Sequence, residues 1–344
     1  MVRAALRLSD SNYRRFERKI AKNKIVISSK FWYIYYEITI KRRRHKMFRE
    51  IKRDDAIFKS EALLKDEIAY SIMFSILNNA EKYKTPKIFS DGKDYAVVNS
   101  DPNHAIIVWT SDDFQEYGAL YDSIKKEFRA NKPFEIWAKN DFYDYLIKGQ
   151  TIPELKDETA DNGRPKLQTL GSWLCSKLND IQYIGHPDQA KQEEVQKIAQ
   201  MMVNFDIETK EDPMAKMSDD YVRLAQKFVS NPLYLVWRDK NEKLVATATL
   251  DKSGKYPRIG RVFTDEDERG KAYAKMLVHY LTNEVFKEGK LAMLYTDYDY
   301  PSSNRCYQKV GYQLSRTVVR FMPPVQGESH IRSRNYMRHT QNTY

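Results

Sequence analysis

The sequence predicts an α/β protein whose main part is a mixed, mostly antiparallel sheet flanked by helices, preceded by a smaller α+β domain. Runs of β-branched and aromatic residues joined by short polar turns indicate antiparallel hairpins. Apolar residues at three- and four-residue spacing between these runs indicate amphipathic helices. The chain has 344 residues, and a single core rarely grows beyond about 250–300 residues, so we expect two domains.

The composition is that of a globular protein with a charged surface. Hydrophobic residues make up 42% of the chain and charged residues 31%, which is enough for packed cores and a well-solvated exterior. There are two cysteines, Cys175 and Cys306, so no disulfide framework is expected and a reducing, cytoplasmic compartment is favoured. The six histidines show no ligand spacing with the cysteines, and we expect no metal site.

The net charge of +11 comes from the first 46 residues. They hold 14 lysines and arginines against three acidic residues, whereas the other 298 residues hold 44 of each sign. The apolar run at residues 25–40 contains Lys30 and Glu37 and is shorter than the about 20 residues of a membrane span, so no span is expected. Residues 1–46 are predicted to be an extension upstream of a natural start at Met47. A basic arm that binds nucleic acid or anionic lipid is the less favoured alternative.

Residues 47–150 form the predicted α+β domain. Apolar spacing from residue 57 to 83 indicates two short helices or one bent helix. Two strand-like runs joined by a polar turn then predict a hairpin. The remaining elements, in order, are a helix at 114–128, a strand at 134–137 and a helix at 141–147.

Residues 151–180 are predicted to connect the two domains. The stretch is polar at first and is punctuated by Pro153, Gly163 and Pro165, which are typical of loops. Residues 167–178 fit either a strand or a short helix, and the pattern leaves both open.

Residues 181–322 form the second domain, and residues 323–344 form a tail. Helical spacing and turn residues predict the following elements: helices at 189–205 and 218–229, strands at 233–237, 244–250 and 256–263, a helix from about 270 to 286, a strand at 291–295, a helix at 303–310 and a strand at 312–321. Ser218 is the expected N-cap of its helix.

The most informative stretch is the start of the helix near residue 270. After an acidic turn at 265–268, which we expect to cap and solvate the helix start, the chain reads Arg269-Gly-Lys-Ala-Tyr-Ala274. Small residues allow a pyrophosphate to approach the unpaired amides of a helix N-terminus. Small residues are also simply good helix formers, so this stretch is not specific by itself.

Together with the elements that follow, the stretch resembles the GNAT superfamily of acyl-CoA-dependent N-acyltransferases. The family loop reads Gln/Arg-x-x-Gly-x-Gly/Ala after a bulged strand, and Arg269 and Ala274 match its ends. Ala272 replaces the middle glycine; we expect helical φ and ψ there, which suit alanine. The second motif, residues 300–312, has Tyr300 where the family usually has asparagine. It retains Asn304, Tyr307 and the final Gly-Tyr pair. The resemblance covers about 140 residues.

The resemblance implies an acetyl-CoA-dependent N-acetyltransferase in which a primary amine, of a small molecule or a protein, attacks directly. The cofactor-binding residues would be Val262 and Thr264 on the strand, Arg269, Gly270, Lys271, Ala272, Tyr273 and Ala274 in the loop, and Asn304. An amide of Val262 or Thr264 would stabilise the anionic carbonyl oxygen. Tyr307 would protonate the CoA thiolate, with Asn304 binding the cofactor or orienting Tyr307. Cys306 is not needed as an acyl carrier.

The general base is left open. Asp297, Glu208 and an ordered water are the candidates, and we place Asp297 with Tyr307 as the predicted catalytic pair. Two alternative functions remain: a CoA-binding module without catalysis, and nucleic-acid binding by residues 1–46. Residues 47–150 could be a degenerate copy of the same fold, but they lack a comparable phosphate loop. The loop at 205–213 contains four acids that favour a cationic amine: Asp206, Glu208, Glu211 and Asp212.

Overall fold

The structure is a computed structural model that describes residues 48–79, 83, 86–128 and 134–323. The predicted extension at 1–46, its nucleic-acid alternative and the tail from 324 onward lie outside the described residues. The short strand β1 (Arg49–Glu50) belongs to one unit with the residues before it, and everything from Ile51 onward belongs to a second unit. The elements described below are those of the second unit.

The first half of this unit contains short helices and small strands. The apolar stretch near residue 57 is divided into three pieces, because the side chain of Asp55 caps one helix and that of Ser60 caps the next. The predicted hairpin is confirmed, whereas β2 was not predicted, because its four residues include Lys87 and Ser90 and show no strand pattern. The elements are η1 (Ala56–Lys59), α4 (Glu61–Leu64), α5 (Ser71–Asn78), β2 (Lys87–Ser90), β3 (Tyr95–Asn99), β4 (Ile106–Thr110), α6 (Tyr117–Glu127), β5 (Ile136–Ala138) and α7 (Asn140–Lys148).

The second half follows the predicted order with two additions. The open stretch at 167–178 is a strand, β6, and a polar edge strand, β7, precedes the first helix. The elements are β6 (Leu167–Cys175), β7 (His186–Gln189), η3 (Gln192–Glu194), α8 (Val195–Glu208), α9 (Asp219–Val229), β8 (Tyr234–Arg238), β9 (Leu244–Asp251), β10 (Arg258–Thr264), η4 (Glu266–Glu268), α10 (Tyr273–Lys287), β11 (Ala292–Asp297), α11 (Pro301–Val310) and β12 (Tyr312–Phe321).

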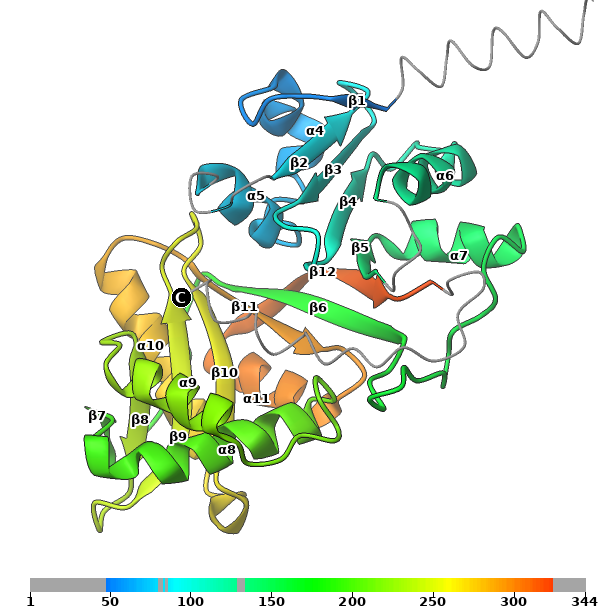
Figure 1. The fold of residues 1–344 in the computed structure, drawn as a ribbon. Helices are drawn as coiled ribbons and strands as arrows, with labels where there is room; N and C mark the ends of the chain where they lie inside the picture. The colour runs from blue at the N-terminus through cyan, green and yellow to red at the C-terminus, as the bar shows by residue number, and fades with distance from the viewer. Residues whose placement is uncertain (1–47, 80–82, 84–85, 129–133, 324–344) are drawn as a thin grey trace, which may run out of the picture. The chain divides into compact units, whose positions relative to one another are not determined.

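These strands form one sheet in the order β2-β3-β4-β5-β12-β6-β11-β10-β9-β8-β7 (Figure 1). Among the described strand pairs, β4 with β5 and β10 with β11 are parallel, and the others are antiparallel. The predicted fold class, a mixed and mostly antiparallel sheet flanked by helices, is confirmed.

The same arrangement occurs twice along this sheet. Each half has three antiparallel strands, a helix, a parallel strand and a second helix, followed by a strand that pairs with the other half. Thus β6 follows α7 but lies beside β11, and β12 follows α11 but pairs with β5. The stretch expected to connect two domains therefore contributes a central strand, and neither half completes its part of the sheet alone.

Helices cover both faces of the second half (Figure 1). One core lies under α8 and α9 and includes Val236 and Phe263. The opposite core lies under α10 and α11 and includes Trp237 and Ile259. Neighbouring strand residues point to opposite faces, so β10 separates the two cores and its side chains reach both of them.

Candidate functional site

The site begins where β10 separates from β11. The two strands pair at Arg258–Met293 and Ile259–Leu294, and the described residues form no further pair between them. β11 continues to Asp297 along β6. The ladder between β10 and β9 is interrupted between Gly260 and Phe263, which marks a bulge. Because the β10–β11 pairing ends at Ile259, the backbone around Val262 has no described strand partner on the β11 side.

The loop before α10 has an unusual backbone conformation and is open at Gly270. Gly270 has a φ of +81° and Ala272 has a φ of +64°, whereas Lys271 between them is not left-handed. Residues of alternating hand turn successive N–H groups to one side, which is how backbone concavities bind anions. A Cβ placed on Gly270 would find no atom within 4 Å. This end of the loop is therefore open.

The helix itself begins at Tyr273 with Ala272 as its N-cap, and not at Gly270 as predicted. The prediction of helical φ and ψ at Ala272 was wrong: its φ is +64°, in the left-handed region. This conformation is unfavourable for a residue with a Cβ, so it could not be expected from an alanine. The first helical hydrogen bond runs from the Met276 N–H to the Ala272 carbonyl. The preceding amides, including those of Ala274 and Tyr273, find no acceptor among the described residues, as at other helix N-termini.

Two acids of the turn before this loop, Asp265 and Glu268, pair with lysines, whereas Glu266 and Asp267 are exposed. Glu268 is buried and pairs with Lys243 at 2.6 Å and with Lys271 at 2.7 Å. These two lysines lower the pKa of Glu268 to about 2. Asp265 pairs with Lys197 at 3.0 Å. Lys271, a predicted cofactor-binding residue, is thus oriented by a carboxylate.

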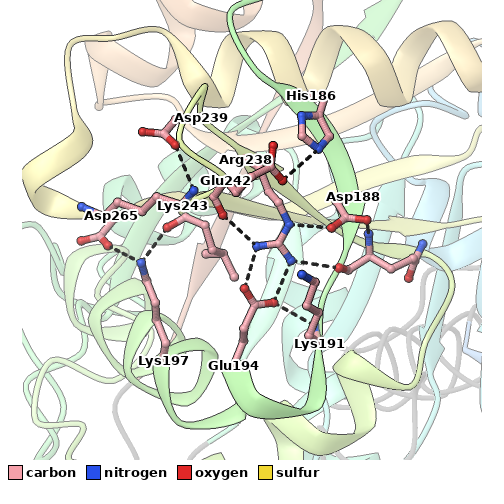
Figure 2. Close-up of polar contacts among 12 residues, drawn as sticks. His186, Asp188, Lys191, Glu194, Lys197, Arg238, Asp239, Glu242, Lys243 and Asp265 are labelled. Carbon is pink, nitrogen blue, oxygen red and sulfur yellow. Dashed lines mark hydrogen bonds and ion pairs between the residues drawn. The ribbon is translucent and has the colours of Figure 1, made fainter.

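Figure 2 shows that the Lys197–Asp265 pair lies beside a second ionic cluster centred on Arg238. This guanidinium is buried and pairs with Asp188 at 2.5 Å and with Glu194 at 2.7 Å. The hydrogen bonds to Arg238 hold the pKa of the Asp188 carboxyl below its ordinary value. The cluster ties the edge strand β7 to β8 and to the start of α8, and so braces the framework of the site.

Arg269, the first residue of the predicted loop motif, spans from the loop to α8. Its guanidinium pairs with Glu208 at 2.5 Å and lies 5.5 Å from the centre of the Phe263 ring. Glu208 is the last residue of α8 rather than a loop residue. One of the candidate bases is therefore engaged by a cation in this structure.

Asn304 is fixed by the turn between β11 and α11. Its Oδ1 accepts a hydrogen bond from Thr296 at 2.7 Å, and its Nδ2 donates to the Tyr298 carbonyl at 2.7 Å. Thr296 in turn accepts from the Trp173 ring of β6 at 2.9 Å. Asn304 makes no hydrogen bond to Tyr307 among the described residues, so the predicted orienting role has no bond to support it.

Tyr307 lies in the apolar wall formed by α10, α11 and the sheet. The residue is 9% exposed and packs edge-on against Tyr312, with ring centres 6.2 Å apart. Its hydroxyl makes no hydrogen bond to any described residue. Burial, with a smaller contribution from Cys306, raises the pKa of Tyr307, so the phenol stays protonated. Burial likewise raises the pKa of the Cys306 thiol, which disfavours a reactive thiolate.

Asp297 lies at the end of β11. Its Oδ2 accepts a hydrogen bond from Gln168 at 2.9 Å and its Oδ1 accepts from the Asp299 N–H at 3.0 Å. The structure brings Asp297 and Asn304 to the same turn, but no hydrogen bond joins Asp297 to Tyr307 in the described part of the chain.

The structure adds polar groups on the α8 and α9 face that the sequence did not predict. Arg261, within the bulge, pairs with Asp206 at 3.3 Å, and Tyr221 donates to Asp206 at 2.7 Å. The acids at 205–213 were visible in the sequence, but their partners lie 15 residues or more away along the chain. A small pocket adjoins this group, lined by Met201, Met202, Phe205, Tyr234, Thr247, Arg261 and Phe263.

Residues 199–312 match the model of the acetyltransferase (GNAT) family. This match starts in α8 and ends at the Gly-Tyr pair after α11, so it contains the bulged strand, the loop before α10 and the Tyr307 helix. The second half of the chain contains a GNAT acetyltransferase domain. No curated protein matches the chain in sequence.

The GNAT domain and the half before it share their fold with solved structures. A GCN5-related N-acetyltransferase from Sphaerobacter thermophilus is similar over 83% of this chain and 97% of its own, with a TM-score of 0.55 and 12% identity. A Drosophila protein is similar over 82% of this chain and 99% of its own, with a TM-score of 0.53 and 8% identity. At these identities the likeness concerns the fold alone, and it extends over both halves.

The GNAT domain shows no sign of a metal centre or a membrane helix in the described residues. No group of three or more histidine, cysteine or acidic side chains there could hold a metal ion. None of the described helices is long and apolar enough to cross a bilayer.

Proposed function

We propose that the GNAT domain transfers an acetyl group from acetyl-CoA to a primary amine by direct attack. One observation carries the proposal: a bulged strand that parts from its parallel neighbour leads directly into a loop that is open at Gly270 and whose amides from Gly270 to Ala272 find no backbone acceptor among the described residues. An extended thioester arm fits the first feature, and a pyrophosphate fits the second.

The phosphates would be held by the backbone of residues 270–274 and by the side chains of Arg269 and Lys271. Both cations are oriented by carboxylates, Glu208 and Glu268. A phosphate bound here would compete for Arg269, which is exposed enough to change partner. The pantetheine would pair with the free backbone of β10 at Val262 and Thr264, as the family resemblance implies.

In the proposed reaction the amine nitrogen attacks the thioester carbonyl, the new C–N bond forms and the C–S bond breaks. An N–H of Val262 or Thr264 would stabilise the negative oxygen. Tyr307 would give its proton to the CoA sulfur. The proton lost by the amine would pass to Asp297 or to an ordered water, because Glu208 is already paired with Arg269.

The second candidate is a CoA-binding module without catalysis. Two observations favour it: the left-handed Ala272 has a methyl group where the family loop has glycine, and the exposed Tyr300 replaces the family asparagine. Nucleic-acid binding concerns residues outside the described part of the chain.

Two measurements test these proposals. Acetyl-CoA should raise the melting temperature of the protein, which both CoA-dependent functions require. Turnover of acetyl-CoA with a panel of primary amines should then be detected for an enzyme and should be absent for a binding module. If acetyl-CoA neither stabilises the protein nor binds in calorimetry, both functions are wrong.

A further inference from the structure

Arg261 adopts an unfavourable backbone conformation at the centre of the bulge. Its φ is +45°, in the left-handed region that a residue with a Cβ rarely occupies. Such residues keep this conformation only where the surrounding structure holds them, and they cluster at functional sites. The contacts of Arg261 therefore show what holds the bulge.

Those contacts come from the end of α8. The Arg261 guanidinium pairs with Asp206 at 3.3 Å and lies 5.5 Å from the centre of the Phe205 ring. The Phe205 ring packs edge-on against Phe263, the residue on the other side of the bulge, with ring centres 6.5 Å apart. The two consecutive α8 residues thus contact the bulge from both sides.

Asp206 is itself fixed from α9. Tyr221 donates a hydrogen bond to its Oδ2 at 2.7 Å, while Oδ1 faces Arg261. The Asp206 side chain is 14% exposed and that of Arg261 is 21% exposed, so water screens the pair weakly. The negative charge of Glu211 also acts on Asp206 and raises the pKa of its carboxyl. α8, α9 and β10 meet at this pair.

We propose that Asp206 and Arg261 are positioning residues: together they hold the bulge in its left-handed conformation, and so aim the N–H groups of Val262 and Thr264 at the acyl carbonyl. The proposal rests on the proposed function, because those amides matter only if the thioester binds along β10. A donor displaced by a fraction of an ångström loses much of its effect on the transition state.

Two substitutions of the same residue separate backbone from side chain. Arg261→Ala removes the pair but keeps a Cβ, so the left-handed conformation remains unfavourable while its ionic contact with Asp206 is lost. Arg261→Gly removes the same pair, but glycine adopts a positive φ without strain. We expect Arg261→Ala to lower kcat by about tenfold or more, with a smaller rise in the KM for acetyl-CoA, because the same backbone would pair with the pantetheine. Arg261→Gly should recover to within about threefold of the natural protein.

Asp206→Asn provides the complementary test. It keeps the size of the side chain and removes its charge, so the bulge loses its electrostatic partner, and kcat should fall as in Arg261→Ala. The matched control is Arg223→Ala, which breaks the exposed Asp220–Arg223 pair on α9 and should leave kcat unchanged. Equal losses in Arg261→Gly and Arg261→Ala would mean that the side chain acts directly and would overturn the proposal. A kcat equal to that of the natural protein in Arg261→Ala or in Asp206→Asn would overturn the proposal as well.

A readout without turnover separates this proposal from the proposed function. Arg261→Gly should melt at a higher temperature than Arg261→Ala, because only the glycine variant relieves the strain. The natural protein could fail to bind or turn over acetyl-CoA while this order of melting temperatures is observed. In that case the proposed function is wrong, but the proposed role of Asp206 and Arg261 in holding the bulge is retained. If Arg261→Ala melts at the higher temperature, the hold on the bulge is wrong.

Discussion

The guanidinium of Arg320, on β12, donates to the Glu211 carboxylate, in the loop between α8 and α9, at 2.6 Å. Arg164 contacts the other oxygen of Glu211 at 3.0 Å and Glu135 at 3.0 Å. Arg320 lies 4.0 Å from Glu135 and closes a ring of alternating charges. Three members are buried, and Glu211 is 38% exposed. The ring fastens this loop to a strand that also pairs with the first half of the chain.

Removing the loop's member of this ring should destabilise the fold. Glu211→Ala leaves two buried guanidinium groups short of a carboxylate, and we expect a loss of about 3 kcal/mol in the free energy of unfolding, the lower end for a broken buried pair because Glu211 is partly exposed. Urea unfolding measures this loss. Asp220→Ala, which breaks an exposed pair, is the control and should change stability by less than about 1 kcal/mol. If Glu211→Ala lowers the free energy of unfolding by less than about 1 kcal/mol, the ring does not stabilise the fold as proposed.

The same residue predicts a pH dependence. Burial raises the pKa of Glu211, but Arg320 and Arg164 lower it more, so its net pKa in the folded protein is below the ordinary value. Its contribution to stability is therefore complete above the pKa of the unfolded chain, about 4.3, and is lost as the pH falls through the lower folded pKa. Glu211→Gln should be less stable than the natural protein at pH 7, and the difference should shrink below about pH 4. A difference that stays constant down to pH 3 would show that charge is not responsible.

Replacing Ala272 by glycine should stabilise the folded protein. The residue has a φ of +64°, where a Cβ costs about 1–2 kcal/mol. Glycine removes this cost but also gives the unfolded chain more conformational freedom, which offsets part of the stabilisation. Ala272→Gly should therefore raise the free energy of unfolding by about 0.5–1 kcal/mol. Ala274→Gly, two residues further on in the first turn of α10, is a matched control and should lower the free energy of unfolding by about 1 kcal/mol. Destabilisation in both variants would argue against the left-handed conformation at 272.

Local patterns in the sequence predicted most elements of the second half, because hairpins and amphipathic helices repeat within a few residues. The exchange of β6 and β12 could not be predicted in this way. β6 pairs with strands more than 100 residues later in the chain, as Ala292 opposite Cys175 illustrates, and no local pattern encodes such a pairing. The ring around Glu211 escaped prediction for the same reason.

The candidate site was predicted as a set of positions and not as a geometry. The loop residues lie at the start of α10, and Asn304 and Tyr307 lie on α11; their roles in cofactor binding and catalysis stay predictions. The left-handed conformation of Ala272 was missed because alanine favours helices. Gly270, two residues earlier, indicates a positive φ at its own position only. Arg261 was missed because a bulge depends on strand pairing rather than on residue type.

Tyr307 and Tyr312 should separate chemistry from stability. Tyr307→Phe removes a hydroxyl that bonds to no described residue, so the fold should remain stable while kcat falls by about a hundredfold or more. The Tyr312 hydroxyl forms a buried hydrogen bond with the Thr282 hydroxyl at 2.8 Å. Tyr312→Phe should therefore lose about 1 kcal/mol of stability and keep its kcat. Unchanged kcat in Tyr307→Phe across pH 6 to 10 would rule out Tyr307 as the proton donor.

The first half of the chain repeats the arrangement of the GNAT domain, but its equivalent opening is closed. β4 and β5 pair in parallel at Ile106–Ile136, like β10 and β11. The residues that follow these two strands form an ion pair, from Lys139 Nζ to Asp112 Oδ1 at 2.6 Å. Lys139 is buried and also contacts Asp66 at 2.9 Å. An ion pair thus stands where the GNAT domain has a free strand edge.

This difference predicts that one chain binds one molecule of acetyl-CoA. Calorimetry should give a stoichiometry of one, because a second thioester arm would have to displace the buried Lys139 from two carboxylates. Gly270→Glu should then abolish binding completely, since it places a side chain at a φ of +81° and a negative charge beside the proposed phosphate position. Gly254→Glu, in the turn between β9 and β10, is the control and should bind normally, because an added Cβ there makes an ordinary contact with the Tyr256 carbonyl oxygen at 3.9 Å. A stoichiometry of two, or residual tight binding in Gly270→Glu, would place a functional site in the first half.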